Sequence, residues 1–147
     1  MTVHLTKREV VDIVRATLPQ AIPIANSCWR NSHLPAGATH CGECIPCFIR
    51  RIAVEFSGAD PTSYNRDPWN DDPASMSEDD IARRNLADLA ELVMKFESSN
   101  EEEIMSEWPE LYAPTINATE VIALYRRFSY EARTVLSRYP SLTPLLS

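Results

Sequence analysis

The amino-acid sequence predicts a mainly α-helical fold, with four to five helices around one core. Two observations lead to this prediction. In several segments apolar residues recur three and four positions apart, and residues that favour helix caps precede these segments, as expected for helices that bury one face. The chain has 147 residues, of which 44% are hydrophobic and 24% charged, and this is enough to bury one sizeable core.

The first helix is expected over about residues 7–18. Thr6 and Glu9 have the spacing of a capping box, and Pro19 follows where the pattern ends. The apolar residues of this segment form one predicted buried face: Val10, Val11, Ile13, Val14 and Leu18.

A second helix is expected to begin near Pro46 and to stop at Gly58, because proline suits the first turn of a helix and glycine suits the position after its end. Residues 22–28 before it are expected to form a short extended segment that delivers Cys28. The predicted buried stripe of the helix comprises Ile49, Ile52, Ala53 and Phe56.

The chain is expected to divide into three parts, 1–58, 59–77 and 78–147. The middle part is rich in Pro, Asp, Asn and Ser and lacks periodicity, which is typical of a connecting loop. Its Tyr64 and Trp69 are expected to fix the loop to the core. The last part is expected to be an acidic helical tail that packs on the same core.

A third helix is predicted over about 78–97, starting from Ser77, since acidic residues follow that cap and stabilise the positive end of the helix dipole. Its predicted buried stripe comprises Ile81, Leu86, Leu89, Val93 and Phe96.

The acidic stretch that follows predicts a short helix over 101–107, and Asn117 or Thr119 is predicted to cap a long last helix that runs up to Pro140. The residues at helical spacing in this last helix are Val121, Leu124, Tyr125, Phe128, Ala132, Val135, Leu136 and Tyr139.

Charge is unevenly distributed. Six Lys/Arg stand against four Asp/Glu up to Gly58, whereas eight stand against seventeen from Ala59 onward. Nucleic acid is therefore not an expected partner of the second half, because phosphate binding depends on clustered basic groups. The sequence has no run of about 18 apolar residues and no apolar core of a signal peptide at its start, so we expect no membrane partner and a cytoplasmic location.

All four cysteines lie between residues 28 and 47. Cys41, Cys44 and Cys47 have Cys-x-x-Cys-x-x-Cys spacing, and Cys28 precedes them across a twelve-residue gap. Gly42 permits the tight turn that folds two thiolates toward one ion. Four thiolates can complete a closed tetrahedral site, which favours a structural zinc ion.

Two alternatives stay open for these cysteines. An iron–sulfur motif begins with the same spacing, but its fourth cysteine normally follows downstream; disulfides or free thiols are the other alternative, although disulfides require an oxidising compartment. His33 and His40 lie in the same loop and are interpreted as solvated residues or as neighbours of the ligands, and His4 as a surface residue.

Several motifs occur together in residues 5–64: KREVV at 7–11, a proline followed by Ser-Cys at 23–28, CGECIPCFIR at 41–50 and DPTSY at 60–64. In combination they resemble the C-terminal part of the 7-cyano-7-deazaguanine synthase family of queuosine biosynthesis. The loop between Cys28 and Cys41 is longer than is usual in that family. The rest of the chain is not covered by the resemblance.

The resemblance implies that Cys28, Cys41, Cys44 and Cys47 bind a structural zinc. It also implies a link to an ATP-dependent carbon–nitrogen ligase that converts 7-carboxy-7-deazaguanine and ammonia to the nitrile and binds ATP through an SGGxDS loop. This chain has only three glycines, none of them adjacent, so it cannot contain that loop. ATP would reach such a system only through another domain or partner, and the chain is expected to be inactive alone.

Three accounts follow from this sequence. In the first account the chain is the zinc-bearing, substrate-side part of a synthase-like system that needs an ATP-binding synthase-like domain or subunit. In the second account it is a synthase-like component of an anti-phage system in which deazaguanine chemistry is directed at a protein acceptor. In the third account it is a stand-alone zinc-stabilised protein-interaction module without catalysis.

Residues that flank the cysteines are candidates for substrate contact, namely Ser27, Trp29, Arg30, Arg50 and Arg51. The alternative is that the arginines are solvated and the tryptophan is packed. We predict no catalytic residue, because neither a Ser-His-Asp set nor a pair of carboxylates stands out.

Overall fold

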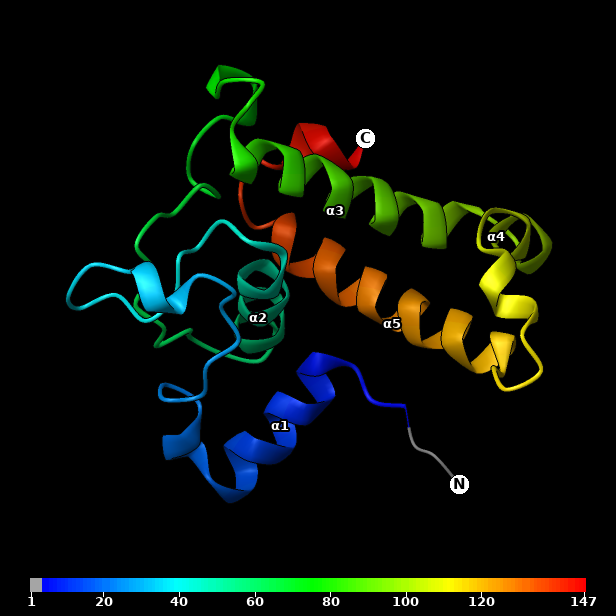
Figure 1. Ribbon diagram of the computed structural model, residues 1–147, viewed down its shortest axis with the longest axis horizontal. Coiled ribbons are helices and arrows are strands. Elements are labelled where there is room, and N and C mark those ends of the chain that lie inside the picture. The colour runs from blue at the N-terminus through cyan, green and yellow to red at the C-terminus, as the bar shows by residue number, and fades with distance from the viewer. Residues whose placement is uncertain (1–3) are drawn as a thin grey trace.

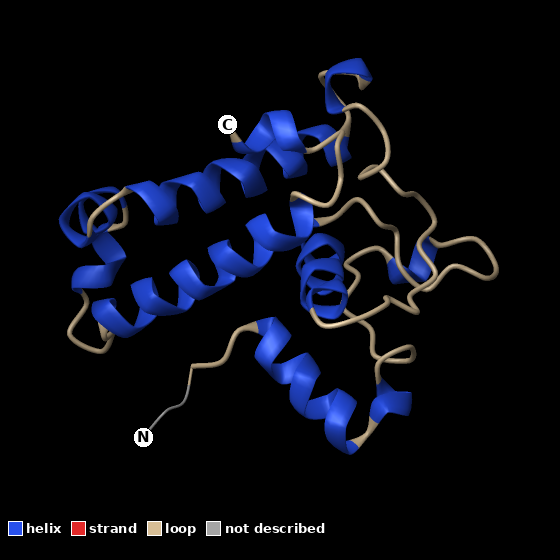
Figure 2. Ribbon diagram, turned by 180° about the vertical axis from the view of Figure 1, so that it is seen from behind, coloured by secondary structure: helices blue, strands red, loops and turns tan. Residues whose placement is uncertain are grey.

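The structure is a computed structural model that describes residues 4–147, so the first three residues of the predicted segment 1–58 lie outside the described part. The described residues form five α-helices and no strand, which confirms the mainly α fold (Figure 2). The helices are α1 (Lys7–Thr17), α2 (Ile45–Phe56), α3 (Ile81–Ser98), α4 (Glu101–Glu107) and α5 (Ala118–Leu136).

The two longest helices, α3 and α5, lie side by side, and α2 packs near the carboxyl end of α5 (Figure 1). α1 packs on α2, and α4 lies at the opposite end of the α3–α5 pair. The long loops that contain the cysteines gather beside α2 (Figures 1 and 2). No described helix combines the length and the apolar character needed to span a bilayer.

The main core lies between α2, α3, α5 and the loop before α3. Trp69 from that loop is fully buried, and its ring meets those of Phe48 at 5.8 Å and Tyr139 at 5.2 Å between centroids. The expectation that Trp69 fixes the loop to the core is therefore confirmed. A smaller cluster of Phe96, Ile104 and Ile122 closes the end of the molecule near α4.

The predicted start of the third helix at Ser77 is wrong. α3 begins at Ile81, because the Asp80 carboxylate accepts hydrogen bonds from the amides of Ala82 (2.8 Å) and Arg83 (3.4 Å) and so caps the helix. Ser77 lies in the preceding turn.

Asn117, one of the two predicted caps, does cap the last helix. The helix ends at Leu136 and does not reach Pro140. Tyr139 lies beyond the helix and is partly buried against the main core. The other predicted helix ends lie within a few residues of the observed ones.

Part of the predicted buried face of the first helix is exposed. Val11 and Val14 pack against α2, whereas Val10, Ile13 and Leu18 are exposed. A helix that contacts one neighbour buries only a narrow stripe, and the predicted face was wider than that stripe. Ile81 of α3 and Tyr125 of α5 are also exposed.

A buried carboxyl joins the start of α1 to α5. Glu131 is 2% exposed; its Oε1 accepts hydrogen bonds from Thr6 Oγ1 (2.8 Å) and Arg8 Nε (3.1 Å), while Oε2 has no hydrogen-bond partner. Burial raises the pKa of Glu131, although the bonds from Thr6 and Arg8 oppose this.

We predict that Glu131→Gln changes how stability depends on pH. The pKa of this carboxyl is higher in the folded state than in the unfolded chain. Above the pKa of the unfolded chain the carboxyl therefore ionises more readily when the chain is unfolded, and this lowers the free energy of unfolding. The free energy of unfolding of wild type minus that of the variant should therefore fall as the pH rises from about 4 through the folded pKa, and level off above it. Urea denaturation at a series of pH values measures this difference, and a difference that rises with pH would contradict the prediction.

Candidate metal centre

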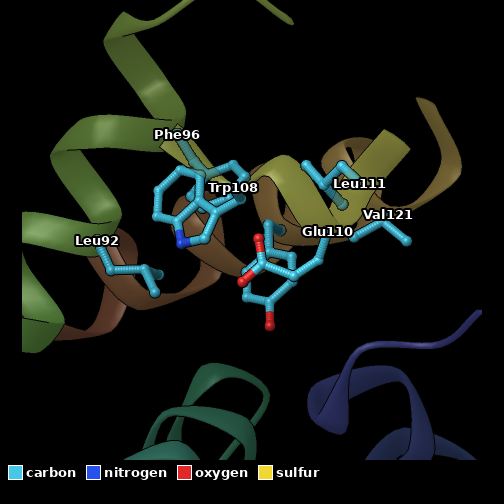
Figure 3. Close-up of a pocket in the computed structure, with 7 residues that line it drawn as sticks. Leu92, Phe96, Trp108, Glu110, Leu111 and Val121 are labelled. Carbon is cyan, nitrogen blue, oxygen red and sulfur yellow. The ribbon is translucent and has the colours of Figure 1, made fainter. Parts of the chain in front are cut away.

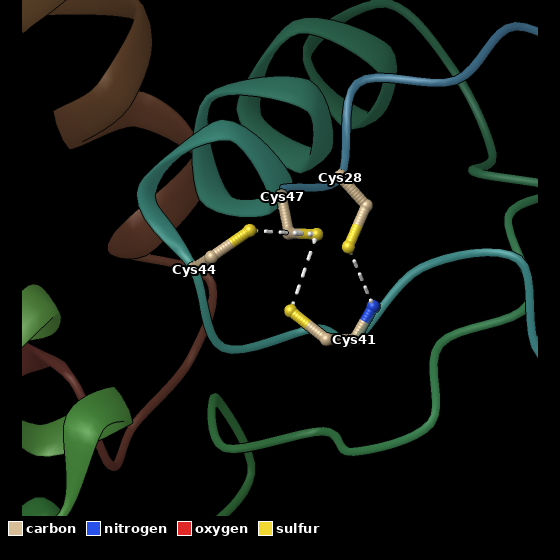
Figure 4. Close-up of side chains that lie close together, drawn as sticks. All are labelled: Cys28, Cys41, Cys44 and Cys47. Atoms are coloured by element: carbon tan, nitrogen blue, oxygen red, sulfur yellow. Dashed lines mark hydrogen bonds between the residues drawn. The ribbon is translucent and has the colours of Figure 1, made fainter. Parts of the chain in front are cut away.

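The four cysteine side chains converge on one point. Cys28, Cys41, Cys44 and Cys47 are all buried, and their sulfur atoms all lie within 4.8 Å of one another (Figure 4). Sulfurs bound to one tetrahedral zinc ion at about 2.3 Å are about 3.8 Å apart. The Cys41–Cys47 and Cys44–Cys47 distances are 3.8 and 3.3 Å. The thiols therefore fit a single metal ion.

Local sequence explains how three of the thiols reach this point. Cys44 is the N-cap of α2 and Cys47 lies in its first turn, so both sulfurs stand at the same end of the helix. Pro46 occupies the first turn, as predicted. Cys41 lies just before, on the other side of the turn at Gly42.

Gly42 is the one position in this turn that tolerates no side chain. Its φ is +82°, and an added Cβ would lie 1.9 Å from the carbonyl oxygen of Arg66. Both the left-handed backbone and the close approach of residue 66 require glycine.

Backbone amides and burial act in opposite directions on the thiols. Burial raises the pKa of Cys44 and of Cys47. For Cys41 burial also opposes ionisation, but amide donors in the turn, those of Glu43 and Cys44, lower the pKa overall. Since thiolates are the metal ligands, an ion that binds here displaces protons, and its affinity rises with pH.

The predicted connecting loop, residues 59–77, also supports the cysteine turn. The amide of His40 donates to Ser63 O (3.2 Å), that of Asn65 to His40 O (2.8 Å) and that of Arg66 to Cys41 O (3.1 Å). Residues 63–66 therefore run beside the cysteine turn as a short backbone ladder.

A network of charged side chains that the sequence analysis did not identify ties the turn to α3. Glu43 pairs with Arg30 and, at 3.2 Å, with Arg66, which also forms two bonds to Asp80 (2.7 and 3.0 Å). Asn85 of α3 donates to the carbonyl of Glu43 (2.8 Å). No local pattern marks these residues, because their partners are distant in sequence.

Arg50 is buried and binds the protein itself. Its guanidinium donates to Thr62 Oγ1 (2.8 Å), Ala25 O (2.9 Å) and Ile22 O (2.5 Å). It therefore fastens both the segment before Cys28 and the DPTSY segment onto α2.

Arg51 is also buried and holds the middle of the same loop. It pairs with Asp67 (2.5 Å) and Glu55 (2.7 Å), donates to Tyr139 OH (3.0 Å), and lies over the Trp69 ring at 4.5 Å. Burial alone would lower the pKa of Arg51, but the carboxylates of Asp67 and Glu55 raise it. The alternative that both arginines are solvated is therefore wrong.

The other three candidate substrate residues lie near Cys28. Trp29 is 74% exposed, so it is not packed, and Arg30 is half exposed while it pairs with Glu43. The hydroxyl of Ser27 is buried without a hydrogen-bond partner. Substrate contact by any of the five residues stays a prediction.

His40 is a buried neighbour of the thiols. Its Nε2 accepts from the Ser27 amide (3.4 Å), so the neutral ring carries its proton on Nδ1, which lies 3.0 Å from Thr39 Oγ1. Burial and then the charge of Arg50 lower the pKa of His40. His33 is exposed, and His4 is a surface residue that pairs with Glu120 at 3.5 Å.

Comparisons with protein-family models, with curated proteins and with solved structures gave no match for this chain. The resemblance to the 7-cyano-7-deazaguanine synthase family therefore depends on the motif residues alone.

We predict that Gly42→Ala lowers metal content and the melting temperature, because the added methyl group meets the Arg66 carbonyl. Gly37→Ala is the matched control: Gly37 has a similar φ of +91°, but its added Cβ would have no neighbour within 4 Å. The control should lower the free energy of unfolding only by the cost of placing alanine in a left-handed backbone, about 1–2 kcal/mol. Equal losses in both variants, measured by metal analysis and thermal unfolding, would contradict the role of the close approach.

Proposed function

We propose that the chain binds one structural zinc ion through Cys28, Cys41, Cys44 and Cys47. The convergence of four buried sulfurs supports this, because four thiolates fill a tetrahedral site and leave no position for substrate. In a four-iron cluster each cysteine thiolate binds a different iron atom, so the sulfurs are farther apart than sulfurs that share one ion. The short distances between the sulfurs therefore favour a single ion such as zinc over a four-iron cluster.

We further propose that this zinc-binding chain is the substrate-side part of a 7-cyano-7-deazaguanine synthase-like system. One observation carries the proposal: the motifs behind the resemblance form one connected unit. Arg50 follows the cysteine motif and bonds to Thr62 of DPTSY and to the segment that leads to Cys28. Because Arg50 needs both segments as hydrogen-bond partners, we expect the three sequence motifs to occur together in one chain.

A hollow beside this unit supports a role in substrate binding. It has a volume of about 390 Å³ and its lining includes Asn26, Asn31, Thr39 and His40. Amide and hydroxyl groups of this kind can bind the polar edge of a purine-like base. The hollow would face the ATP-binding partner, which supplies the nucleotide chemistry.

The zinc proposal predicts about one zinc per chain, without the visible absorption of iron and sulfide. Cys44→Ser should lose the metal and leave the region up to residue 58 open to protease, since structural zinc sites contribute on the order of 10 kcal/mol to folding. His33→Ala removes an exposed loop residue and is the control that should keep both metal and protection. Iron with labile sulfide, or a metal-free protein prepared under reducing conditions, would refute the zinc assignment.

The synthase proposal predicts that the isolated chain neither binds ATP nor converts 7-carboxy-7-deazaguanine. Cradles for ATP phosphates are built from glycines and cations, and this chain has three separate glycines and an acidic second half. Nitrile formation, followed by mass spectrometry, should appear when an SGGxDS-bearing domain is added to the chain. The same domain without the chain, and with the Cys44→Ser variant, provides the controls; equal rates in all three mixtures would favour the interaction module instead.

A further inference from the structure

An apolar slot opens where α3, α4 and α5 meet, at the end of the molecule opposite the cysteines (Figures 1 and 3). Its volume is about 240 Å³. The apolar side chains that line it come from α3, from α5 and from the segment directly after α4: Leu92, Phe96, Trp108, Leu111, Val121 and Tyr125.

The slot is held open by stacked aromatic rings. Phe96 is stacked with both Tyr125 and Trp108, at centroid distances of 4.8 and 5.3 Å and with the rings within 20° of parallel. Phe96 is buried and packs with Ile104 and Ile122 beneath the slot. Because the rings support one another, the slot is preformed and a ligand need not order it.

An acidic hollow adjoins the slot and shares Leu92 and Trp108 with it. The hollow has a volume of about 340 Å³, and its charged lining consists of Asp88, Glu91, Glu107 and Lys95. Lys95 pairs with Glu107. Asp88 and Glu91 are exposed and have no cationic partner in the described part of the chain. Glu110, which is also exposed, adds a carboxylate at the slot itself (Figure 3).

These features exclude several occupants. The side chains on the walls of the slot offer few hydrogen-bond donors that could orient a base or another polar small molecule. The carboxylates repel phosphate groups. A second copy of the chain is also disfavoured, because the chain carries a net charge of −7 and its acidic half would repel itself.

We propose that the slot and the hollow together bind a basic amphipathic segment of a partner protein. One large apolar side chain of the segment fills the slot, and Lys or Arg residues beside it on the same helix face pair with Asp88 and Glu91. The apolar anchor supplies most of the affinity, and the opposite charges supply rate and selectivity. This surface is separate from the cysteine site, so the inference does not depend on the proposed function.

The test uses the full chain as purified and a fluorescent helical peptide of leucine and lysine, with binding followed by anisotropy. Two control peptides have serine in place of leucine or glutamate in place of lysine, and both should bind at least about tenfold more weakly. The indole N–H resonance of Trp108 should shift during titration with the first peptide, since Trp108 lines both the slot and the hollow.

The double variant Asp88→Asn/Glu91→Gln should weaken binding about tenfold and reduce its dependence on salt. Glu78→Gln/Asp79→Asn makes the same change of charge at exposed positions outside the hollow, and this control should change binding less than about twofold. Both variants alter exposed side chains, and equal melting temperatures verify that each is folded.

The proposal is overturned if the leucine–lysine peptide fails to bind, if the glutamate peptide binds equally well, or if the control variant loses as much affinity as the hollow variant. An unshifted Trp108 resonance would place the peptide elsewhere. A Trp108 resonance that shifts with protein concentration alone would assign the slot to a second copy of the chain.

Discussion

The arrangement of the molecule depends on four thiols that must meet at one point. Between Cys41 and Cys47 the chain has to reverse and begin a helix within a few residues, and Gly42 at positive φ and Cys44 as the N-cap accomplish this. The start and direction of α2 are thereby fixed, and α1 and α5 both pack on α2. A metal ion bound by these thiols would contribute free energy comparable to the total stability of a small domain, and it would hold the first turn of α2 in place.

Two adjacent arginines extend this order to the loops. Neighbouring residues on a helix point about 100° apart, so Arg50 and Arg51 reach different segments. Arg50 holds the segment before Cys28 and the start of the loop at Thr62, and Arg51 holds the loop farther along at Asp67. A buried guanidinium without partners costs several kcal/mol. These two are stable because carbonyls, hydroxyls and carboxylates surround them, and the first part of the long loop is consequently fixed at two points, Thr62 and Asp67.

Local features of the fold were predictable from the sequence, and features that depend on distant contacts were not. The Thr6 capping box and the turn at Gly42 each depend on residues a few positions apart, and the four cysteines lie in one short segment of the sequence. Each of these features was identified. The start of α3 was misplaced because Ser77 and Asp80 are both good caps, and only Asp80 also pairs with Arg66. The burial of Arg50 and Arg51 depends on residues more than ten positions away, so their sequence neighbourhood gave no sign of it.

The two ends of the molecule are organised by different forces. At the cysteine end, thiols, buried arginines and a backbone ladder hold loops that have few apolar residues of their own. At the other end, the cluster of Phe96, Ile104 and Ile122 joins α3, α4 and α5 without any residue of α2. The apolar slot is therefore supported by hydrophobic packing that does not pass through the cysteine site. A chain built in this way can present one surface shaped by the cysteine cluster and another shaped by aromatic stacking, each with its own chemistry.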